Sequence, residues 1–549
     1  MKLTDEQYAI LGTNDNIVIN AVAGSGKTTT LIEYALTRLS NKRILYLAFN
    51  KTVKIEAEQK FAAAGLRNVT VETAHSLAFN YIVKGSNYTI TPGYKTYELV
   101  DILEIVTGER HVDYMIASHV NRFISYFCNS TAARVQELNY LEVVAELKAR
   151  QFVENYYSVI EYLTRQALAK MHRAEISIIH DFYLKKFQLN RPVLPYDYIL
   201  FDEGQDASSA MLDVFLQQPA IKIIVGDVHQ QIYGWRFAIN SLLKTDFPFY
   251  NLSKSFRFNR DIAAMANKIL DWKSYLQQPP TVEVQGVGKG RGKIKTRAIL
   301  ARTNLSLLTS AITQWQDRDI NKVYFEGRMS SYMFADGGAS LYDVLNLYNG
   351  KPDMVRDKLI AGMKNMDELE DYIEKTEENG LSAIVDVVKE YGNDLPKFIA
   401  RLKENEVENK EDADMIFSTV HRCKGMEYDA VTLLNDFITE EKLKRFIGEK
   451  MDENRLVEEI NILYVAVTRA KIELNMPAPR PARRIEKKSG AGNQGKYWSA
   501  NEDQELTDLF HAGLNARQIA AQLERSPGGV QMRLQKLGLM GENDYLDYG

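Results

Sequence analysis

The 549-residue sequence has few of the features that mark secreted or membrane proteins. Its two cysteines, Cys128 and Cys423, are too few for a disulfide framework or a cysteine-based zinc site. No apolar run approaches the roughly 18 residues that a membrane-spanning helix requires. The opening stretch "MKLTDEQYAI" lacks the long apolar core of a secretory signal. We therefore expect a protein of the cytoplasm (the host cytoplasm for a virus, the nucleus for a eukaryote) with no membrane partner.

The sequence also lacks a strong excess of charge of either sign. The formal net charge is −4, so any surface for nucleic acid must be local. Hydrophobic residues make up 45% and charged residues 26%, which is the balance of an ordinary globular protein. At roughly 100–200 residues per domain, the length predicts three to five compact units.

Strand and helix patterns alternate over the first ninety residues. A helical pattern begins at Thr28, directly after a short apolar run and a glycine-rich loop. Strands separated by helices of this length predict a parallel sheet with crossover helices. The strands expected in this sheet are Asn16–Asn20, Arg43–Phe49, Asn68–Ala74, Tyr196–Asp202 and Ile221–Asp227, with a mostly helical insertion from Phe79 to Phe187.

A second set of strand patterns predicts a second α/β unit with strands at Arg297–Thr303, Met415–Val420 and Ala430–Asn435. An acidic helical stretch interrupts it, and we expect this stretch to be a solvated insertion with little chemistry of its own. The predicted organisation is a first α/β unit at 1–90 and 186–255 with a helical insertion at 91–185, a second at 256–325 and 412–476 with a helical insertion at 326–411, a basic flexible linker at 477–496 and a small all-α module at 497–540.

The residues after Met476 differ in composition from the rest of the chain. Prolines, then glycines and an excess of basic residues predict a flexible linker. Three short helices are expected beyond it, beginning with a capping-box pattern at Ser499 and Glu502. The third would present Arg533 and Lys536, which suit phosphates or base edges. The module resembles helix-turn-helix or Myb/SANT-like DNA-binding domains, although a three-helix bundle that docks on a protein has the same pattern.

The stretch "NAVAGSGKTTTL" predicts a loop that binds phosphate. Gly24 and Gly26 allow backbone N–H groups to converge on an anion at the start of a helix. Lys27 would reach the β- and γ-phosphates, and the Thr28 hydroxyl would ligate Mg²⁺. Ala21 stands where such loops usually begin with glycine, which costs little if its φ is negative. The alternative is a glycine-rich turn without a ligand.

The stretch "YILFDEGQD" places an acidic pair at the carboxyl end of a predicted strand, where ligands bind in open α/β sheets. Asp202 would hold Mg²⁺, and Glu203 would orient or deprotonate an attacking water. An acidic pair alone is commonly a surface feature. Together with a phosphate loop in the same sheet, it predicts hydrolysis of a nucleoside triphosphate.

Further motifs occur in the order found in the UvrD/Rep-like superfamily 1 DNA helicases, and the chain resembles this family and in particular its F-box DNA helicase branch. Two positions depart from the family pattern. Gly204 replaces the alanine of D-E-A-Q-D, and "LSKSFRF" puts Phe256 where the family has a stacking tyrosine. The matching segments, from Leu3 to Lys471, are "LTDEQYAIL", "AVAGSGKTTT", "LAFNKT", "TAHSLA", "DEGQD", "VGDVHQQIYGWRFA", "LSKSFRF", "STVHRCKGMEYDAV" and "EEINILYVAVTRAK".

The resemblance implies two RecA-like P-loop domains that use ATP and Mg²⁺. Gln7 would read the adenine, and Gln230 would sense the γ-phosphate. Arg257 and Arg469, from the second unit, would face Lys27 across the γ-phosphate and stabilise the charge that develops there. The expected nucleotide contacts are Gln7, Ala23, Gly24, Ser25, Gly26, Lys27, Thr28, Thr29, Asp202, Phe256, Gly425 and Glu427, the catalytic group is Glu203, Gln230, Arg257 and Arg469, and the metal ligands are Thr28 and Asp202.

Aromatic residues, rather than a basic stripe, are the candidates for contact with DNA. Tyr233 and Trp235 would stack on unpaired bases, and Phe49 would add a second stacking surface. The alternative is that an aromatic residue after a strand belongs to the core. The expected DNA contacts are Phe49, Asn50, Lys51, His75, Tyr233, Trp235, Thr419 and His421, with Arg533 and Lys536 in the C-terminal module.

These patterns predict an ATP-dependent helicase or translocase that acts on single-stranded DNA and on single/double-strand junctions. We expect a monomer that works with replication or recombination proteins in DNA replication, recombination or repair. The direction of movement, 3′ to 5′, is implied only by the resemblance. A translocase that mainly strips proteins from DNA would share every motif. A nucleotide-gated switch without motor activity is a third alternative and predicts no stimulation of hydrolysis by DNA.

Overall fold

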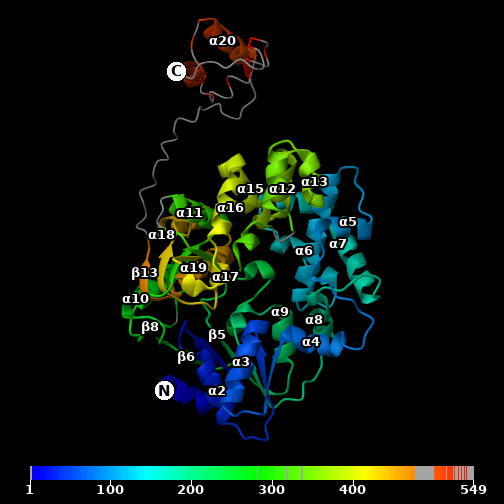
Figure 1. Cartoon of the computed structure of the whole chain (residues 1–549). Helices are drawn as coiled ribbons and strands as arrows, with labels where there is room; N and C mark the ends of the chain where they lie inside the picture. The colour runs from blue at the N-terminus through cyan, green and yellow to red at the C-terminus, as the bar shows by residue number, and fades with distance from the viewer. Residues whose placement is uncertain are drawn as a thin grey trace. The chain divides into compact units, whose positions relative to one another are not determined.

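The computed structural model describes residues 3–280, 282–316, 320–334 and 338–476, and in the C-terminal part 500–512, 514, 516–523, 525, 530, 533–534, 537 and 539–540. Contacts within the chain divide it into a main unit, Met1–Met476, and a C-terminal unit, Pro477–Gly549. Figure 1 traces the elements of both units. Within the described ranges, no helix is long and apolar enough to cross a membrane.

The first lobe of the main unit is built on a six-stranded parallel sheet, and all five strands predicted for it are present. Its strands are, in spatial order, β3 (Val69–Thr73), β2 (Ile44–Ala48), β4 (Tyr198–Phe201), β5 (Ile221–Gly226), β1 (Ile17–Ala21) and the unpredicted β6 (Phe249–Leu252). Strands β1, β2 and β4 are buried along their whole length, as expected when helices cover both faces of a parallel sheet.

This strand order positions the candidate site. Strand β5 lies between β4 and β1, so the loops after three neighbouring parallel strands meet at one edge of the sheet. The glycine loop follows β1, the acidic pair follows β4, and the third loop follows Gly226 at the end of β5. The helices that accompany the sheet are α1 (Asp5–Leu11), α2 (Lys27–Leu36), α3 (Lys51–Ala63) and α9 (Ser209–Leu216).

The second lobe has a five-stranded parallel sheet with the order β10 (Val323–Phe325), β11 (Met415–Thr419), β9 (Arg297–Ala301), β12 (Tyr428–Leu433) and β13 (Ala470–Asn475). The three predicted strands correspond to β9, β11 and β12. Strand β10 has only three residues and β13 has a partly polar sequence, so neither shows a continuous apolar run. The lobe also contains α10 (Arg260–Asp271), α11 (Asn304–Gln316), α17 (Val420–Cys423), α18 (Glu440–Gly448), α19 (Glu453–Val467) and a small parallel pair, β7 (Lys254–Ser255) and β8 (Gln285–Gly286).

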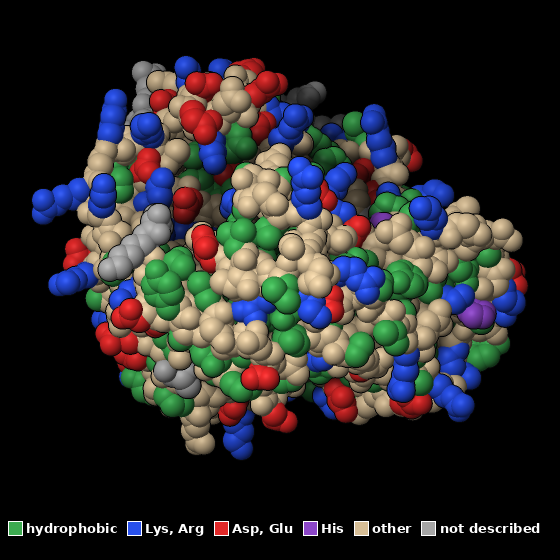
Figure 2. All heavy atoms as spheres, turned by 90° about the horizontal axis from the view of Figure 1, so that it is seen from below, with side chains coloured by type: hydrophobic (Ala, Val, Ile, Leu, Met, Phe, Trp, Pro, Cys, Tyr) green, Lys and Arg blue, Asp and Glu red, His purple; other side chains and the backbone are tan. Residues whose placement is uncertain are grey.

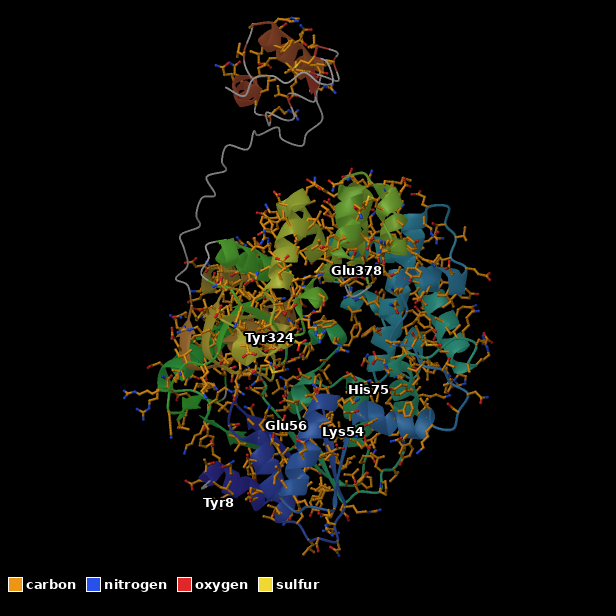
Figure 3. All side chains as sticks on the ribbon, in the orientation of Figure 1. Tyr8, Lys54, Glu56, His75, Tyr324 and Glu378 are labelled. Carbon is orange, nitrogen blue, oxygen red and sulfur yellow. The ribbon has the colours of Figure 1, made fainter. Side chains whose placement is uncertain are left out.

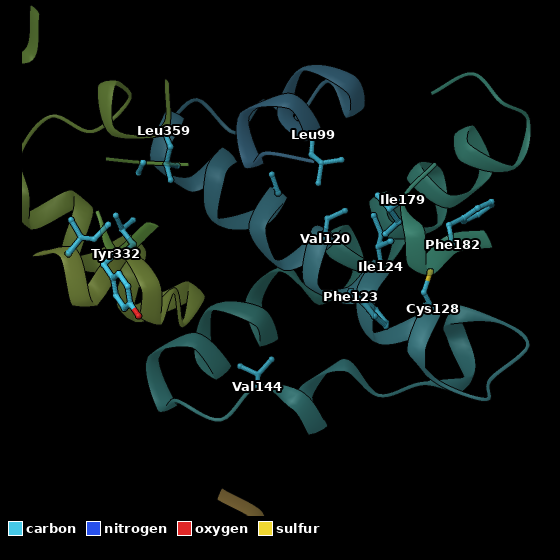
Figure 4. Packing of buried hydrophobic residues seen from close by; sticks show 14 of the residues in the cluster. Leu99, Val120, Phe123, Ile124, Cys128, Val144, Ile179, Phe182, Tyr332 and Leu359 are labelled. Atoms are coloured by element: carbon cyan, nitrogen blue, oxygen red, sulfur yellow. The ribbon is translucent and has the colours of Figure 1, made fainter. Parts of the chain in front are cut away.

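The first insertion is helical, as predicted, and consists of α4 (Ala74–Ile82), α5 (Thr96–Leu103), α6 (Arg110–Asn129), α7 (Leu147–His172) and α8 (His180–Leu189). Both predicted bounds, 91 and 185, differ from the structure. The helical part begins with α4, directly after β3, and α4 packs against α8. Residue 185 falls inside α8, which buries Phe182 and Phe187 in the same apolar core. Figure 4 shows Phe182 and Cys128 in this core, beside Ile124 and Ile179.

The second insertion contains α12 (Leu341–Tyr348), α13 (Lys358–Ala361), α14 (Met366–Thr376), α15 (Asn379–Tyr391) and α16 (Leu395–Glu404). The expectation of a merely solvated stretch is wrong, because α14 packs against α6 and α7 of the first insertion. His119 Nε2 lies 2.8 Å from the Lys375 carbonyl, and Arg122 forms an ion pair with Glu377. Figure 3 labels the neighbouring Glu378, whose Oε1 accepts a hydrogen bond from Ser118.

The described part of the C-terminal unit includes α20 (Ala500–His511) and α21 (Ala516–Gln522). They enclose a small apolar core of Leu506, Ile519, Ala520, Leu523, Val530 and Leu534. The predicted linker at 477–496, the cap at Ser499 and Lys536 lie outside the described residues, as does most of the third expected helix. The helix-turn-helix assignment therefore stays a prediction.

Candidate functional site

The glycine loop leads from β1 into α2 and has a shape that favours glycine at two positions. Gly24 and Gly26 have positive φ angles of 76° and 82°. A Cβ at Gly24 would lie 2.6 Å from Arg257 Cβ, so glycine also allows the chain after β7 to approach the loop. Ala21 is the buried last residue of β1 and is not among the described residues with positive φ, so alanine is compatible with this position.

The residues of the loop fit a phosphate ligand. Ser25 Oγ is buried and has no hydrogen-bond partner in the described structure, although buried hydroxyls are nearly always paired. Lys27 and Thr28 open α2, where the first N–H groups of the helix lack partners within it. The half-buried Thr28 and the buried Asp202 are the side chains that would hold Mg²⁺, which typically takes one or two protein ligands beside nucleotide phosphates.

Gln7, Ala23 and Thr29 complete the predicted contacts around this loop. Gln7 is buried, donates to Thr30 Oγ1 at 2.8 Å and accepts from the Thr4 N–H, so it connects α1 to α2. Ala23 is also buried, whereas Thr29 is exposed. Their contacts with nucleotide stay predictions.

The loop and the acidic pair form one charged cluster. Lys27 Nζ donates to Glu203 Oε1 at 2.6 Å, and the Tyr46 hydroxyl donates to Asp202 Oδ2. Burial opposes the charge on Lys27, but the carboxylates of Glu203 and Asp202 outweigh it and raise the lysine pKa. Burial and the nearby Glu203 charge raise the pKa of Asp202, whereas Lys27 and Lys424 hold that of Glu203 low despite its burial. Glu203 is thus ionised, as a group that accepts a proton from water must be.

The turn after β4 explains the glycine that departs from the family pattern. Glu203 has a positive φ of 53°, and Gly204 follows it in a tight turn. A Cβ at Gly204 would lie 2.6 Å from Ile224 Cγ2 on the adjacent strand. Glycine therefore allows this turn to pack closely against β5.

Asp227 was not among the predicted site residues, yet it organises the loop after β5. Its carboxylate accepts from the His229 N–H at 2.9 Å, from Gln230 Nε2 at 2.8 Å and from the Tyr464 hydroxyl at 3.0 Å. Tyr464 belongs to α19, so this buried carboxylate connects the predicted sensor Gln230 to the second lobe. In the sequence, Asp227 is the last residue of the predicted strand Ile221–Asp227. Nothing in that strand indicates that its carboxylate has partners in the other lobe.

Arg257 and Arg469, the two arginines expected to face the γ-phosphate, both contact Thr468. Burial and the nearby Arg257 charge lower the pKa of Arg469. Arg257 Nε forms a 2.7 Å ion pair with Glu427 Oε2, and its Nη1 donates to the Thr468 carbonyl. Arg469 is 1% exposed and donates to the carbonyls of Val465 and Met426. Arg469 thus has local backbone partners in this structure.

The remaining nucleotide candidates of the second lobe surround Arg257. Phe256 is 39% exposed, and its N–H donates to the Gly24 carbonyl at 2.9 Å. Gly425 has a positive φ of 89° and leads to Glu427. The second lobe therefore reaches the glycine loop through backbone as well as side chains.

Lys424 is the functional candidate that the sequence reasoning missed. It follows α17 of the second lobe, forms an ion pair with Asp206 and donates to the Gln230 carbonyl at 2.6 Å. Its ammonium also lies 4.8 Å from the centre of the Tyr233 ring. Lys424 lies within the matched segment "HRCKGMEY", so the sequence contained it. Its role could not be read there because its partners, Asp206 and Gln230, are distant in sequence. Lys424 joins the acidic loop, the sensor loop and the aromatic residues.

The predicted aromatic residues form a connected group across the two lobes. The rings of Phe49 and Tyr233 are stacked, with centroids 5.9 Å apart and an interplanar angle of 16°. Trp235 is 60% exposed and meets Tyr233 edge-on at 6.5 Å. His421 of α17 lies 6.1 Å from Tyr233, and its Nε2 lies 3.0 Å from the Ile232 carbonyl. The group provides an exposed ring beside the nucleotide site.

The other predicted DNA contacts differ in position. Asn50 caps α3 by accepting from the Val53 N–H, and Lys51 is exposed. His75 of α4 lies 3.4 Å from Asp181 of α8, and Figure 3 shows it on the side of the first insertion. Thr419 is buried at the end of β11. In the C-terminal unit, Arg533 forms an ion pair with Asp503.

A buried contact between Lys273 and His229 also joins the two lobes, close to Asp227. Lys273 lies in the short helix η6 (Trp272–Leu276), and its Nζ is 2.8 Å from His229 Nδ1. Both side chains are buried, and His229 Nε2 has no partner in the described structure. Burial lowers the pKa of Lys273 to about 7, although Asp227 opposes this shift.

Comparison with known proteins agrees with this arrangement. Residues 3–248 match the model of the UvrD/REP helicase N-terminal domain. This range contains the glycine loop, the acidic pair, Gln230 and the aromatic residues of the first lobe. The match covers the first lobe, and the two parallel sheets are consistent with the two RecA-like lobes of UvrD/Rep-like helicases.

Individual relatives extend the similarity into the second lobe. The chain is 29% identical over 509 residues to F-box DNA helicase 1 of Gallus gallus, covering 86% of this chain and 48% of the relative. It is 28% identical over 529 residues to F-box DNA helicase protein 1 of Schizosaccharomyces pombe, covering 86% and 57%. ATP-dependent DNA helicase PcrA of Leuconostoc citreum is 23% identical over 286 residues, with 48% and 38% covered. The chain thus spans about half the length of the two F-box relatives.

Proposed function

We propose that this protein is an ATP-dependent DNA helicase or translocase that moves 3′ to 5′ along single-stranded DNA. The observation that carries the proposal is the position of Lys424. Its ammonium forms an ion pair with Asp206 and donates a hydrogen bond to the Gln230 carbonyl, both in the first lobe, and it lies over the Tyr233 ring. A change at the γ-phosphate would therefore reach the aromatic residues through a single side chain.

The residues of the site divide the work of hydrolysis. Lys27 and the glycine loop bind the phosphates, and Thr28 with Asp202 would hold Mg²⁺, which neutralises phosphate charge when bound. Glu203 accepts a proton from the attacking water. Arg257 and Arg469 belong to the other lobe, so their attraction to the developing charge depends on closure of the two lobes.

The exposed ring of Trp235, beside the partly exposed Tyr233, supports the assignment of single-stranded DNA as the substrate. Bases stack on such rings regardless of sequence, each contributing about 1–3 kcal/mol. On the face shown in Figure 2, Lys and Arg side chains are interspersed with acidic ones rather than gathered into one patch. The aromatic group around Tyr233 and Trp235 is the source of affinity that we propose.

We also propose that the protein acts on single/double-strand junctions and works with replication or recombination proteins. We further propose that it is a monomer located in the cytoplasm or the nucleus.

The decisive experiment measures ATP turnover with and without single-stranded DNA, followed by unwinding of duplexes with 3′ or 5′ tails. We expect DNA to stimulate turnover and only 3′-tailed substrates to be unwound. DNA-stimulated turnover with translocation but little unwinding would favour a protein-stripping translocase. The absence of any stimulation would favour a nucleotide-gated switch and contradict the motor.

Trp235→Ala tests the stacking surface. Loss of one stacked base predicts roughly tenfold weaker binding of single-stranded DNA and less unwinding per ATP hydrolysed. Fluorescence anisotropy with a labelled oligonucleotide measures the binding. Leu39→Ala, at another exposed apolar side chain, is the matched control. Wild-type affinity and unwinding in Trp235→Ala would remove this residue from the DNA path.

A further inference from the structure

The first insertion contains a hollow that the proposed motor function does not use. It lies between η1 (Val135–Glu137), α7 and α8, with a volume of about 300 Å³, and we call it the insertion groove. This volume is at the lower end of the range for pockets that take a ligand group. The side chains of Phe127, Leu168 and Phe182 are buried beneath it, and Leu189 is 41% exposed at its edge.

The insertion groove is lined by lysine and arginine side chains, beside the polar Gln136 and His172. Arg134, Arg165, Lys185 and Lys186 contribute to the lining, which contains no carboxylate. Arg165 is nearly half exposed and forms an ion pair with Glu161 on the same helix, with 3.4 Å between Nε and Oε1. Arg134 is exposed and forms no ion pair within the described part of the chain. Because these cations come from three different elements, the groove favours a ligand with several negative charges.

The buried Lys185 gives a second, independent reason to expect an anion. Its side chain is 2% exposed, and its Nζ donates to the Ser130 carbonyl at 2.8 Å and lies 4.8 Å from the centre of the Phe127 ring. In the described structure, no carboxylate lies within ion-pair distance of it. Burial lowers the pKa of Lys185 to about 8, and the more distant Cys128, Asp213 and Glu137 oppose this only in part. Buried charges are ordinarily paired.

The apolar floor distinguishes between classes of anionic ligand. A nucleic-acid backbone would satisfy the cations but would leave the apolar floor unfilled. An acidic peptide with a leucine or phenylalanine between its carboxylates satisfies both parts of the groove.

We propose that the insertion groove binds an acidic peptide segment of a partner protein, with an apolar side chain of the peptide seated over Phe127 and Phe182 and its carboxylates paired with Arg134, Arg165 and Lys186. Such a site would recruit a partner to the first insertion without occupying the nucleotide loop. The proposal does not depend on motor activity.

The test uses the full-length chain and a fluorescein-labelled peptide, acetyl-DEDLFDED-amide, in an anisotropy titration without nucleotide or DNA. We expect saturable binding that weakens at least tenfold in the double variant Arg165→Glu/Lys186→Glu. Lys185→Met should also weaken binding, because it removes a positive charge from the lining of the groove. The variant should still fold, because a buried charge without a partner of opposite sign is costly and Met has a similar size. Arg150→Glu, an exposed arginine on the same helix α7 outside the groove, should bind like the wild type.

A second peptide, acetyl-DEDAADED-amide, separates the groove from general charge attraction. We expect it to bind at least tenfold more weakly, since it lacks the apolar anchor. Equal binding of both peptides, or no saturable binding of the first, would overturn the proposal. It would also be overturned if a short DNA duplex lost affinity in Arg165→Glu/Lys186→Glu while the acidic peptide did not bind. Circular dichroism confirms that each variant is folded.

Discussion

The glycine loop and the insertion groove each place a lysine ammonium away from solvent, but their surroundings differ. Lys27 is neutralised by Glu203 and by the nearby Asp202, and its pKa is raised. Lys185 has a carbonyl and an aromatic ring as its near partners, and its pKa falls to about 8. A site already supplied with carboxylates suits an anion that brings its own cation, such as ATP with Mg²⁺. A site without them suits an anion alone.

Removal of Lys27 is expected to have the largest effect on this comparison. Lys27→Ala removes the phosphate contact and leaves the carboxylates of Asp202 and Glu203 without their lysine. We expect a loss of ATP turnover on the order of a hundredfold to a thousandfold, as for other preorganised charge-stabilising groups. A coupled phosphate-release assay measures it, with the surface variant Lys42→Ala as control. Turnover at the wild-type level in Lys27→Ala would refute the phosphate-binding role.

Lys424→Met removes the ammonium that pairs with Asp206 and so tests the contact between the two lobes. The Asp206 side chain is fully buried, so loss of its partner leaves an unpaired charge and should reduce the free energy of unfolding by about 3–5 kcal/mol. Adding Asp206→Asn removes that charge and should restore at least half of the loss. Chemical unfolding of both single variants and the double variant measures the coupling. Strictly additive effects would show that the ion pair does not connect the lobes energetically.

Lys273→Met extends the comparison to a fourth lysine, which is buried, contacts His229 and lies near Asp227. Its folded pKa of about 7 is below the unfolded value, so unfolding takes up a proton between these pH values. The stability of the wild type should therefore rise between pH 7 and pH 9, by on the order of 2 kcal/mol from this group. Lys273→Met should lack that rise, whereas Lys268→Met, at an exposed lysine of α10, should keep it. An unchanged pH dependence in Lys273→Met would place the titration elsewhere.

The sequence was informative where chemistry is local in the chain. The strand, glycine loop and helix around Lys27 are contiguous, and so are β4 and the acidic pair, so both features were predictable. Lys424 was missed because its partners Asp206 and Gln230 lie in the other lobe. Asp227 was missed because its connection to the second lobe, through Tyr464, is distant in sequence. The shortness of β10 and the polar sequence of β13 removed the apolar runs by which strands are recognised.

Packing between distant segments explains the other differences. The acidic stretch around α14 looked solvated because many of its residues are charged, yet Leu369 and Tyr372 are buried. Its charges include Glu377, which pairs with Arg122 of the first insertion. Periodicity in one segment cannot reveal a partner more than two hundred residues away.

The contact of α14 with α6 and α7 also has a mechanical consequence. Each insertion leaves and re-enters its own sheet, so the two lobes are connected in two regions: around the nucleotide site, through contacts such as Lys424 with Asp206, and through the insertions. Two contact regions restrict the relative rotation of the lobes more than one region would. If the two lobes move apart at the nucleotide site, either the ion pair between Arg122 and Glu377 breaks or the two insertions rotate together as one rigid body.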